Sequence, residues 1–370
     1  MRELIDGNEA IVRAALDAGC DFYAGYPITP ATPILIAMSQ ELPRVGGTAL
    51  QTEDEIAAMG VCIGAVLSGA RAMTATSGPG ISLYSESIGA ALMCEVPLVI
   101  VDCQRMGPAT GGATTVAQGD VQFLQWGTSG GYPQIVVCPS TVAECYELTG
   151  KAFSLAEHFR IPVFIAADKE LAATRVTVES DHLTGIKPAV RNTLPLDEPY
   201  HIYPGEQPGT PVPLTHLGGS HLVRTSTSSH DESGYLIKDP QIIDRLNQHL
   251  WEKVNSNRTE LEDVTWDTQA GADTLIISYG ITAQAVRAAV SIAHQDGRCV
   301  SNLILRSLWP VPEAAIRSAL SGIKNILVVE LNHGQYRREI ERLASAEQQV
   351  MGLNRVDGRL ITPAQILERV

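Results

Sequence analysis

Three residues in the first third of the sequence have side chains that could bind a ligand or transfer a proton, and each lies at an expected strand end or helix start. Thr29 is the first of them. It lies in Tyr26-Pro-Ile-Thr-Pro30, directly after an expected strand. The two prolines fix φ at their own positions and push the residues before them toward extended geometry, so the loop is stiff. Its hydroxyl is expected at the carboxyl end of the strand, the edge where open α/β sheets bind ligands. A rigid connection with a buried threonine is the alternative.

Glu55 is the second candidate, and it closes the acidic triplet Glu53-Asp54-Glu55 at an expected helix start. Acidic residues in a first turn complement the helix dipole and need no catalytic role. A carboxylate that faces a ligand on the same edge as Thr29 could instead donate or accept a proton. Both interpretations are open from the sequence.

Arg105 is the third candidate, and it follows the apolar run 97–103 and opens a glycine-rich loop at 107–114. An arginine at the end of a strand can bind a carboxylate through two parallel hydrogen bonds, whereas a solvated loop arginine is equally compatible with this position. The turn 76–80, Thr-Ser-Gly-Pro-Gly, allows close backbone approach to a ligand or is a plain connection. No segment has the glycine spacing typical of nucleoside triphosphate or dinucleotide sites.

Alternating strands and helices are expected to position these residues. Strands are expected at 21–24, 48–51, 72–75, 97–102, 135–138 and 163–167, and helices at 31–42, 53–69, 82–94 and 142–158. This alternation predicts a doubly wound parallel sheet.

The sequence divides into three parts. Residues 1–180 form the doubly wound α/β domain, and residues 181–265 form a connector rich in proline and histidine, closed by a helix near 240–255. Periodic strands and helices resume in residues 266–370, which predict a second, smaller α/β domain.

The bulk composition is that of a globular protein, with 370 residues, 45% hydrophobic and 18% charged. The net charge of −14 and the absence of a basic run argue against nucleic-acid binding. Seven dispersed cysteines predict a reducing compartment without disulfides, and neither they nor the connector histidines His216, His221 and His230 have metal-ligand spacing. No signal peptide or membrane-spanning run is recognisable, so a cytoplasmic protein is expected.

The motifs carry more information in combination than singly. In this order, they resemble the α subunit of 2-oxoacid:ferredoxin oxidoreductases, particularly of the 2-oxoglutarate type. The motifs are Gly25-Tyr-Pro-Ile-Thr-Pro30, Glu53-Asp-Glu-Ile-Ala-Ala58, Ala72-Met-Thr-Ala-Thr-Ser-Gly-Pro-Gly80, Gln104-Arg-x-Gly-Pro-x-Thr-Gly111, Gln118-Gly-Asp120, Arg306-Ser-Leu-Trp-Pro310 and Val329-Glu-x-Asn332. The resemblance covers nearly the whole chain.

The resemblance implies an enzyme that depends on thiamine diphosphate and is divided between subunits. The α chain supplies a pyrimidine-binding-type domain and a smaller domain like the C-terminal domain of transketolase. A partner β subunit supplies the diphosphate and Mg²⁺ site and a [4Fe-4S] cluster, with further subunits possible. In agreement, the sequence has no Gly-Asp-Gly followed by paired asparagines and no cysteine cluster. The implied reaction converts a 2-oxo acid and coenzyme A to acyl-CoA and CO2 while reducing ferredoxin, and an isolated α chain is inactive.

The resemblance also implies a role for individual residues. Glu55 would hydrogen-bond the aminopyrimidine ring of the cofactor and act as the catalytic residue. The other cofactor-binding positions are Pro27, Ser77 and Gly78, and the substrate-binding positions are Thr29, Arg105, Ile28 and Thr110. No metal site is implied on this chain.

Alternatives remain open within and outside this class. Relatives often have serine at the position of Ala109 and a His-Gly-Asp or His-Gly-Glu at 129–131, where this chain has Ser-Gly-Gly. Branched-chain, aryl and pyruvate-type 2-oxo acids are therefore rival substrates to 2-oxoglutarate. A non-catalytic assembly subunit of the same fold is a second alternative, because fold does not fix function. A dinucleotide-dependent dehydrogenase is a third, disfavoured by the missing glycine fingerprint.

Overall fold

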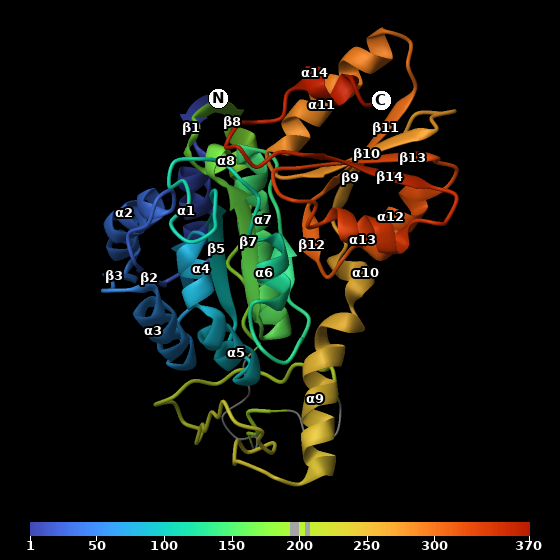
Figure 1. The fold of residues 1–370 in the computed structure, drawn as a ribbon. Coiled ribbons are helices and arrows are strands. Elements are labelled where there is room, and N and C mark those ends of the chain that lie inside the picture. Colours follow the sequence, from blue (N-terminus) through green and yellow to red (C-terminus); the bar gives the residue numbers. More distant parts are fainter. Residues whose placement is uncertain (193–199, 204–207) are drawn as a thin grey trace.

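The computed structural model describes residues 1–192, 200–203 and 208–370 (Figure 1). Three prolines of the expected connector, Pro195, Pro199 and Pro204, lie outside these described residues. The first α/β domain is coloured blue to green in Figure 1 and the second orange to red, with the connector and its closing helix in yellow.

The first domain is built on a seven-stranded sheet in the order β12-β6-β7-β5-β4-β2-β3, parallel except for β12. Its strands are β2 (Phe22–Gly25), β3 (Thr48–Gln51), β4 (Ala72–Thr76), β5 (Leu98–Gln104), β6 (Ile135–Val137), β7 (Pro162–Asp168) and β12 (Ser307–Trp309). Every residue of β5 and β7 is buried, as expected for central strands covered on both faces. After β2 the chain adds β3 on one side of that strand and then β4 on its other side. The direction in which successive strands are added therefore reverses between β2 and β4. Ligands bind at such a switch point.

Helices cover both faces of this sheet. They are α1 (Gly7–Asp17), α2 (Thr32–Glu41), α3 (Glu55–Leu67), α4 (Pro79–Leu83), α5 (Ser85–Met93), α6 (Val121–Trp126), α7 (Val142–Phe159) and α8 (Lys169–Ala173), with short 3₁₀ turns at Leu42–Val45 and Ser180–Leu183. The single helix expected at 82–94 is wrong: two helices, α4 and α5, meet at Tyr84. The first starts earlier than expected because Pro79 suits a first helical turn.

The second domain has a five-stranded sheet in the order β14-β13-β10-β11-β9, parallel except for β9. Its elements are β9 (Val264–Asp267), β10 (Thr274–Tyr279), α11 (Thr282–Gln295), β11 (Val300–Leu305), α12 (Glu313–Leu320), β13 (Asn325–Glu330), α13 (Arg337–Leu343), β14 (Gln349–Asn354) and α14 (Pro363–Leu367). Between β11 and α12 the chain crosses to the first sheet, where β12 pairs with β6. This edge strand ties the two domains together.

A strand pair and two helices lie outside these two sheets. A two-stranded antiparallel pair joins β1 (Arg2–Ile5) to β8 (Val176–Glu179), and neither strand was expected from the sequence. The connector ends in α9 (Pro240–Asn255) and α10 (Arg258–Leu261), and α9 matches its expected range. No helix in the described ranges combines the length and apolar character needed to cross a membrane.

A buried ion cluster fastens α9 to the first domain. One carboxylate oxygen of Glu95 accepts from Lys253 Nζ at 2.9 Å and lies 3.0 Å from His249 Nε2. Lys253 Nζ also donates to the carbonyl of Arg160 at 3.0 Å, and Arg160 in turn donates to the connector carbonyl of Ile202 at 2.8 Å. All four ionisable side chains are at most 2% exposed. The charges of Lys253 and Arg160 outweigh burial and hold the pKa of Glu95 well below its usual range.

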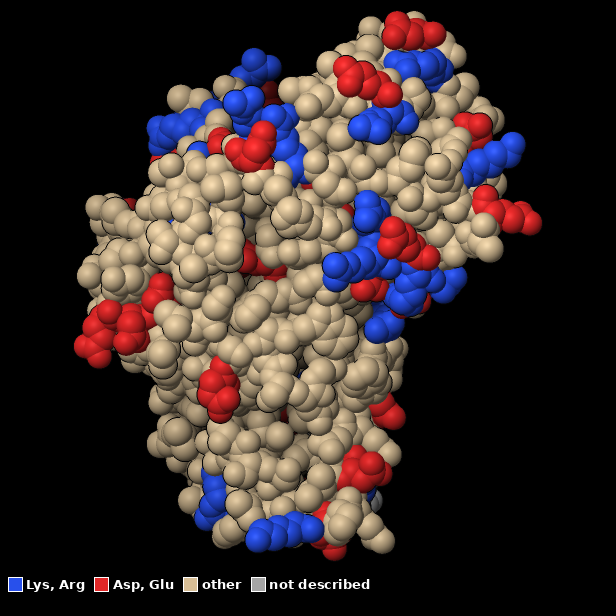
Figure 2. All heavy atoms as spheres, in the orientation of Figure 1, with Lys and Arg blue, Asp and Glu red and all other residues tan. Residues whose placement is uncertain are grey.

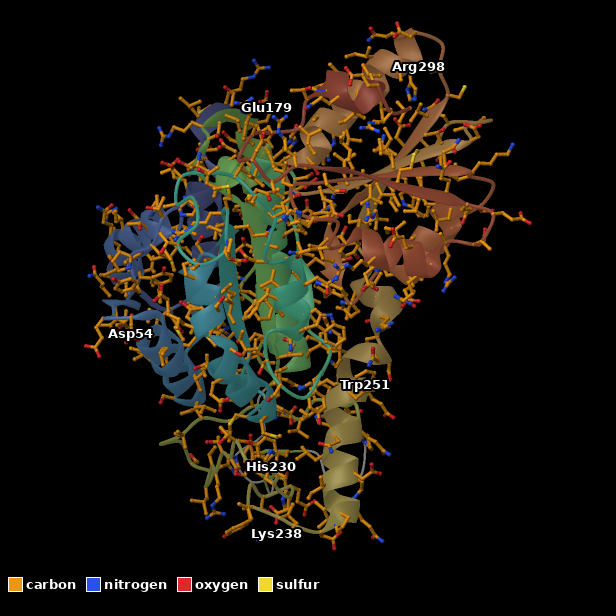
Figure 3. The ribbon with its side chains drawn as sticks, viewed as in Figure 1. Asp54, Glu179, His230, Lys238, Trp251 and Arg298 are labelled. Carbon is orange, nitrogen blue, oxygen red and sulfur yellow. The ribbon has the colours of Figure 1, made fainter. Side chains whose placement is uncertain are left out.

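We predict that Lys253→Met lowers the free energy of unfolding by about 3–5 kcal/mol, because the variant leaves the Glu95 carboxylate buried without its main counter-charge. Urea denaturation of the full chain measures the change. Lys238→Met is the matched control. Lys238 is exposed just before α9, at the bottom of the view in Figure 3. Equal stability of the two variants would contradict the role assigned to this cluster.

Candidate active site

Arg105 links two loops at the sheet edge where β2 and β5 end. Its Nη1 donates to the carbonyl of Thr29 at 2.6 Å, and its Nη2 donates to the carbonyl of Thr110 at 3.1 Å. The side chain is only 5% exposed, and its Nε has no partner among the described residues. The guanidinium is therefore fixed by two backbone acceptors while part of its donor capacity stays unused.

Glu55 lies at the other side of the same edge, as the first residue of α3. The N-cap of that helix is Asp54, whose carboxylate accepts from the backbone N–H of Ala57 at 2.7 Å. Asp54 therefore caps the helix, and Glu55 is left for another task. Its side chain is buried, with 6% exposure. An acid whose only role is to complement the helix dipole does not need burial, which is costly for a charge.

Gly80 in the first turn of α4 makes the space that Glu55 occupies. A Cβ atom at this glycine would lie 2.7 Å from a Glu55 carboxylate oxygen and 2.0 Å from Oγ1 of Thr76. The carboxylate, the Thr76 hydroxyl and the backbone of α4 thus converge on one point. The missing side chain is what permits this approach.

The turn between β4 and α4 joins the two sides of the site. Gly78 has φ of +33°, and a Cβ atom there would lie 3.8 Å from Cγ of Arg105. The hydroxyls of Thr76 and Ser77 are fully buried and have no hydrogen-bond partner in the parts of the chain that the structure describes. Buried polar groups in native proteins are normally paired, which makes these hydroxyls candidates for contacts to a bound ligand. Together with the Glu55 carboxylate they supply two hydroxyls and one acidic group for such contacts.

All eight residues singled out from the sequence therefore lie on this edge of the first domain. Pro27 and Ile28 are half-buried in the loop after β2, and Thr29 and Thr110 are exposed. Direct contacts connect Arg105 to the loops of Thr29 and Thr110, and the turn 76–80 spans from Arg105 to Glu55.

Sequence reasoning missed two residues at this site. Gly80 was noted only as part of a turn, and Tyr84 was not singled out. Tyr84 is fully buried, and its hydroxyl lies 2.9 Å from Oγ1 of Thr74. The charge of Glu55 contributes to raising the pKa of Tyr84, after the larger effect of burial. A tyrosine within an apolar stretch gives no sequence signal for this position.

The second domain holds the loop that follows Arg105. The side-chain amide of Gln118 donates to the carbonyl of Tyr279 at 3.1 Å and to Asp168 at 3.3 Å, while its oxygen accepts from Leu331 N at 2.9 Å. Asn332 Nδ2 donates to the Gln118 carbonyl at 2.8 Å. The motifs Gln118-Gly-Asp120 and Val329-Glu-x-Asn332 are thus two halves of one junction, where strand ends of both domains meet.

Three carboxyl groups lie near this junction: those of Asp102 and Asp168 are buried, and that of Asp120 is partly buried. Burial raises the pKa of Asp168 to about 7, and burial raises the pKa of Asp120 to about 6 despite the opposing charge of Arg105. Burial and the neighbouring charge of Asp120 hold the pKa of Asp102 well above its usual range. No group of three or more histidine, cysteine or acidic side chains in the described ranges is arranged to hold a metal ion.

The fold and the site together define a class of protein: a thiamine-diphosphate-binding type of α/β subunit, with a buried carboxylate at the start of a helix and a smaller second α/β domain. The chain belongs to the pyruvate flavodoxin/ferredoxin oxidoreductase family. Residues 13–240 match the family's thiamine-diphosphate-binding region, and residues 272–366 match core domain II of pyruvate:ferredoxin oxidoreductase. The expected family and fold class are confirmed.

Relatives agree with this assignment over the full chain. The chain is 39% identical to the 2-oxoglutarate synthase subunit KorA of Methanothermobacter thermautotrophicus, covering 99% of this chain and 97% of that protein. It is 34% identical to the ketoisovalerate oxidoreductase subunit VorB of the same organism, covering 100% and 97%. A solved 2-oxoglutarate:ferredoxin oxidoreductase from Magnetococcus marinus, with 2-oxoglutarate, coenzyme A and succinyl-CoA bound, matches with a TM-score of 0.92 at 30% identity. This match covers all of our chain but only 64% of the solved one.

We predict a pH dependence of stability from Asp168. Between the ordinary aspartate pKa of 3.8 and about 7, the folded chain keeps a proton that the unfolded chain has released. Folding is therefore disfavoured progressively as the pH rises through this window. Asp168→Asn removes the effect, because the amide oxygen can still accept from the backbone N–H of Ile281, the contact that Asp168 makes.

The stability gain of Asp168→Asn over the wild type should accordingly grow from pH 4 to pH 7 and level off above, in urea denaturation at each pH. Asp181→Asn, at an exposed position, is the control and should show no such trend. A gain that is independent of pH would contradict the assigned titration.

Proposed function

We propose that this chain is the α subunit of a 2-oxoacid:ferredoxin oxidoreductase that acts on 2-oxoglutarate. The reaction joins the acyl group to coenzyme A, releases CO2 and passes the two electrons so freed to ferredoxin. The observation that carries the proposal is the buried Glu55 carboxylate beside Gly80, next to the loops that hold Thr29 and Arg105. The full-length likeness to 2-oxoglutarate synthase subunits supports the choice of substrate.

Glu55 is proposed as the catalytic residue of this chain. Thiamine diphosphate, when bound, supplies the carbon nucleophile for the 2-oxo carbonyl and accepts the electron pair that CO2 leaves behind. Glu55 would share a proton with a ring nitrogen of the aminopyrimidine, a hydrogen bond strengthened by the burial of its side chain. Pro27, Ser77 and Gly78 would complete the pocket for that ring. The two unpaired hydroxyls of Thr76 and Ser77 support this part of the proposal.

Substrate binding is proposed for the other side of the site. The cationic Arg105 would attract the carboxylate of the 2-oxo acid, and the contacts to Thr29 and Thr110 would keep its guanidinium oriented. Ile28 and the Thr29 and Thr110 side chains would line the same space. Because two of its nitrogens already donate to carbonyls, Arg105 has Nε and its remaining Nη hydrogens for this purpose.

A partner β subunit would complete the active site. Thr29 and Thr110 are exposed, whereas decarboxylation of this kind needs a site closed to water. We propose that the partner covers this edge and carries the diphosphate and Mg²⁺ site and a [4Fe-4S] cluster, which would pass electrons to ferredoxin. The relatives are named as subunits, which supports an assembly. A cytoplasmic location is part of the same proposal.

A branched-chain 2-oxo acid is the second candidate substrate, because the chain is also 34% identical to a ketoisovalerate oxidoreductase subunit. Reduction of viologen that depends on coenzyme A, assayed with a panel of 2-oxo acids on the complex purified from its native cells, separates the two. The highest kcat/KM with 2-oxoglutarate supports the proposal. A preference for a branched-chain acid would contradict the substrate assignment and leave the reaction class intact.

We predict that Glu55→Gln lowers kcat of the assembled complex by at least about 100-fold, because an amide cannot share a proton with the ring in the same way. Glu53→Gln, an exposed acid two positions earlier, is the matched control and should keep normal turnover. Gel filtration must show that the Glu55→Gln complex still assembles. Normal turnover in that assembled complex would favour a non-catalytic scaffold.

A further inference from the structure

A row of polar side chains crosses the ends of β4 and β5 on one face of the first sheet. Thr76 pairs in register with Asp102, and Gln104, two positions further along β5, pairs in register with Asp168 on β7. Residues in register on neighbouring strands share a face of the sheet, as do residues two positions apart on one strand. The backbone N–H of Asp120 donates to Oε1 of Gln104 at 3.3 Å. We call Thr76, Asp102, Gln104 and Asp120 the polar row.

The polar row begins at the Glu55 carboxylate. The Thr76 hydroxyl and a Glu55 carboxylate oxygen lie on either side of the small space at Gly80, where an added Cβ atom would approach both within 2.7 Å. The row ends at Asp120, whose side chain is partly exposed. It therefore leads from the candidate catalytic carboxylate to an acid that is accessible to solvent.

The polar row is buried, but its hydrogen bonds are incomplete. Thr76, Asp102 and Gln104 are fully buried. Among the described residues there is no partner for the Thr76 hydroxyl, for either carboxylate oxygen of Asp102, for the side-chain nitrogen of Gln104 or for one carboxylate oxygen of Asp120. Ordered water molecules normally complete the hydrogen bonds of such buried groups. The row thus has the composition of a continuous hydrogen-bonded path.

Asp102 is able to hold a proton within this path. Burial holds its pKa well above the usual range, and the charge of Asp120 and, to a smaller extent, that of Asp168 act in the same direction. A protonated carboxyl group donates one hydrogen bond and accepts others, whereas an ionised one only accepts. Two further ionisable side chains lie close to the row, Cys103 next to Asp102 and Arg105 next to Asp120.

The proposed reaction needs a route for a proton. Joining the acyl group to the thiol of coenzyme A frees the thiol proton, while the two electrons leave to ferredoxin, so each turnover releases one proton. A site that the partner subunit closes to water cannot pass this proton directly to solvent. Figure 2 shows few charged side chains on the surface over the first domain, since most lie at its margins and on the second domain. Inside the domain, the polar row joins Glu55 to acids that can take up the proton.

We propose that the polar row carries protons between Glu55 and Asp120, and that Asp102 takes up and releases the proton midway. The inference rests on the proposed function for the role of Glu55. Asp102 gives its proton to the ionised Asp120 and is refilled through the Thr76 hydroxyl, which takes the proton held at Glu55. Water molecules bridge the groups that do not touch. In each step one O–H bond forms as another breaks, so Glu55 loses one proton and solvent gains one. Asp102 acts through Glu55 and does not touch the cofactor.

Asp102→Asn tests the polar row, because the amide keeps the shape of the side chain and its hydrogen bonds but cannot take up and release a proton. The measured rate is the exchange of the C2 proton of bound thiamine diphosphate for deuterium in the assembled complex without a 2-oxo acid, followed by acid quenching and NMR. This exchange requires that a proton leave the site and a deuteron enter it. Calorimetric titration of thiamine diphosphate and the midpoint of thermal unfolding show whether the variant keeps the site intact. Asp181→Asn, at an exposed position, is the control.

We expect Asp102→Asn to slow the exchange at least tenfold while its cofactor affinity and unfolding midpoint stay at the wild-type values, and Asp181→Asn to exchange normally. Wild-type exchange in Asp102→Asn overturns the proposal. If Asp102→Asn binds the cofactor more weakly or unfolds earlier, Asp120→Asn at the partly exposed end of the row decides. A tenfold slower exchange in Asp120→Asn supports the proposal, and normal exchange overturns it.

The outcomes separate this inference from the proposed function. A wild-type complex that oxidises a 2-oxo acid, and whose Asp102→Asn form exchanges the C2 proton normally, refutes the polar row as a proton path and leaves the function intact. A wild-type complex that oxidises no 2-oxo acid, yet exchanges the C2 proton in a manner slowed by Asp102→Asn, refutes the proposed reaction and supports the proton path.

Discussion

The absence of a side chain at Gly80 is the constraint on which the site depends. Thr76, Gly80 and Glu55 come from the end of a strand, the first turn of one helix and the first residue of another, and they meet where a Cβ atom would not fit. Asp54 caps the start of α3, so the neighbouring Glu55 carboxylate is not needed as the cap. The sheet brings the loops together, because its strand order reverses between β2 and β4 and the loops after these strands lie at one edge.

Rigid surroundings hold this edge in place. Arg105 ties the loop after β2 to the loop after β5, and Gln118 ties the following segment to strand ends of the second domain. Far from the site, the cluster of Glu95 and Lys253 anchors α9 on the first domain, from which the chain continues into the second. The second domain thus holds the segment that follows Arg105, while the ion cluster holds the closing helix of the connector on the first domain.

Much of the fold could be predicted from the sequence, because alternating apolar runs and helix starts specify a doubly wound sheet. The prolines around Thr29, the acids before α3 and the strand before Arg105 marked the candidate site for the same local reasons. Other features depend on contacts between distant residues. Nothing in the local sequence predicts these contacts. They are the pairing of β12 with β6, the hydrogen bond between Gln118 and Leu331, and the close approach at Gly80. The break at Tyr84 was missed because the apolar periodicity continues across it.

The affinity of the assembled complex for thiamine diphosphate, compared between the wild type and Gly80→Ala by calorimetric titration, tests the central claim most directly. A single added methyl group must displace the Glu55 carboxylate or the Thr76 hydroxyl. We predict that the complex still assembles and binds the cofactor at least about tenfold more weakly, a loss of about 1.4 kcal/mol or more. Wild-type affinity and turnover in that variant would contradict the assignment of this space to the cofactor.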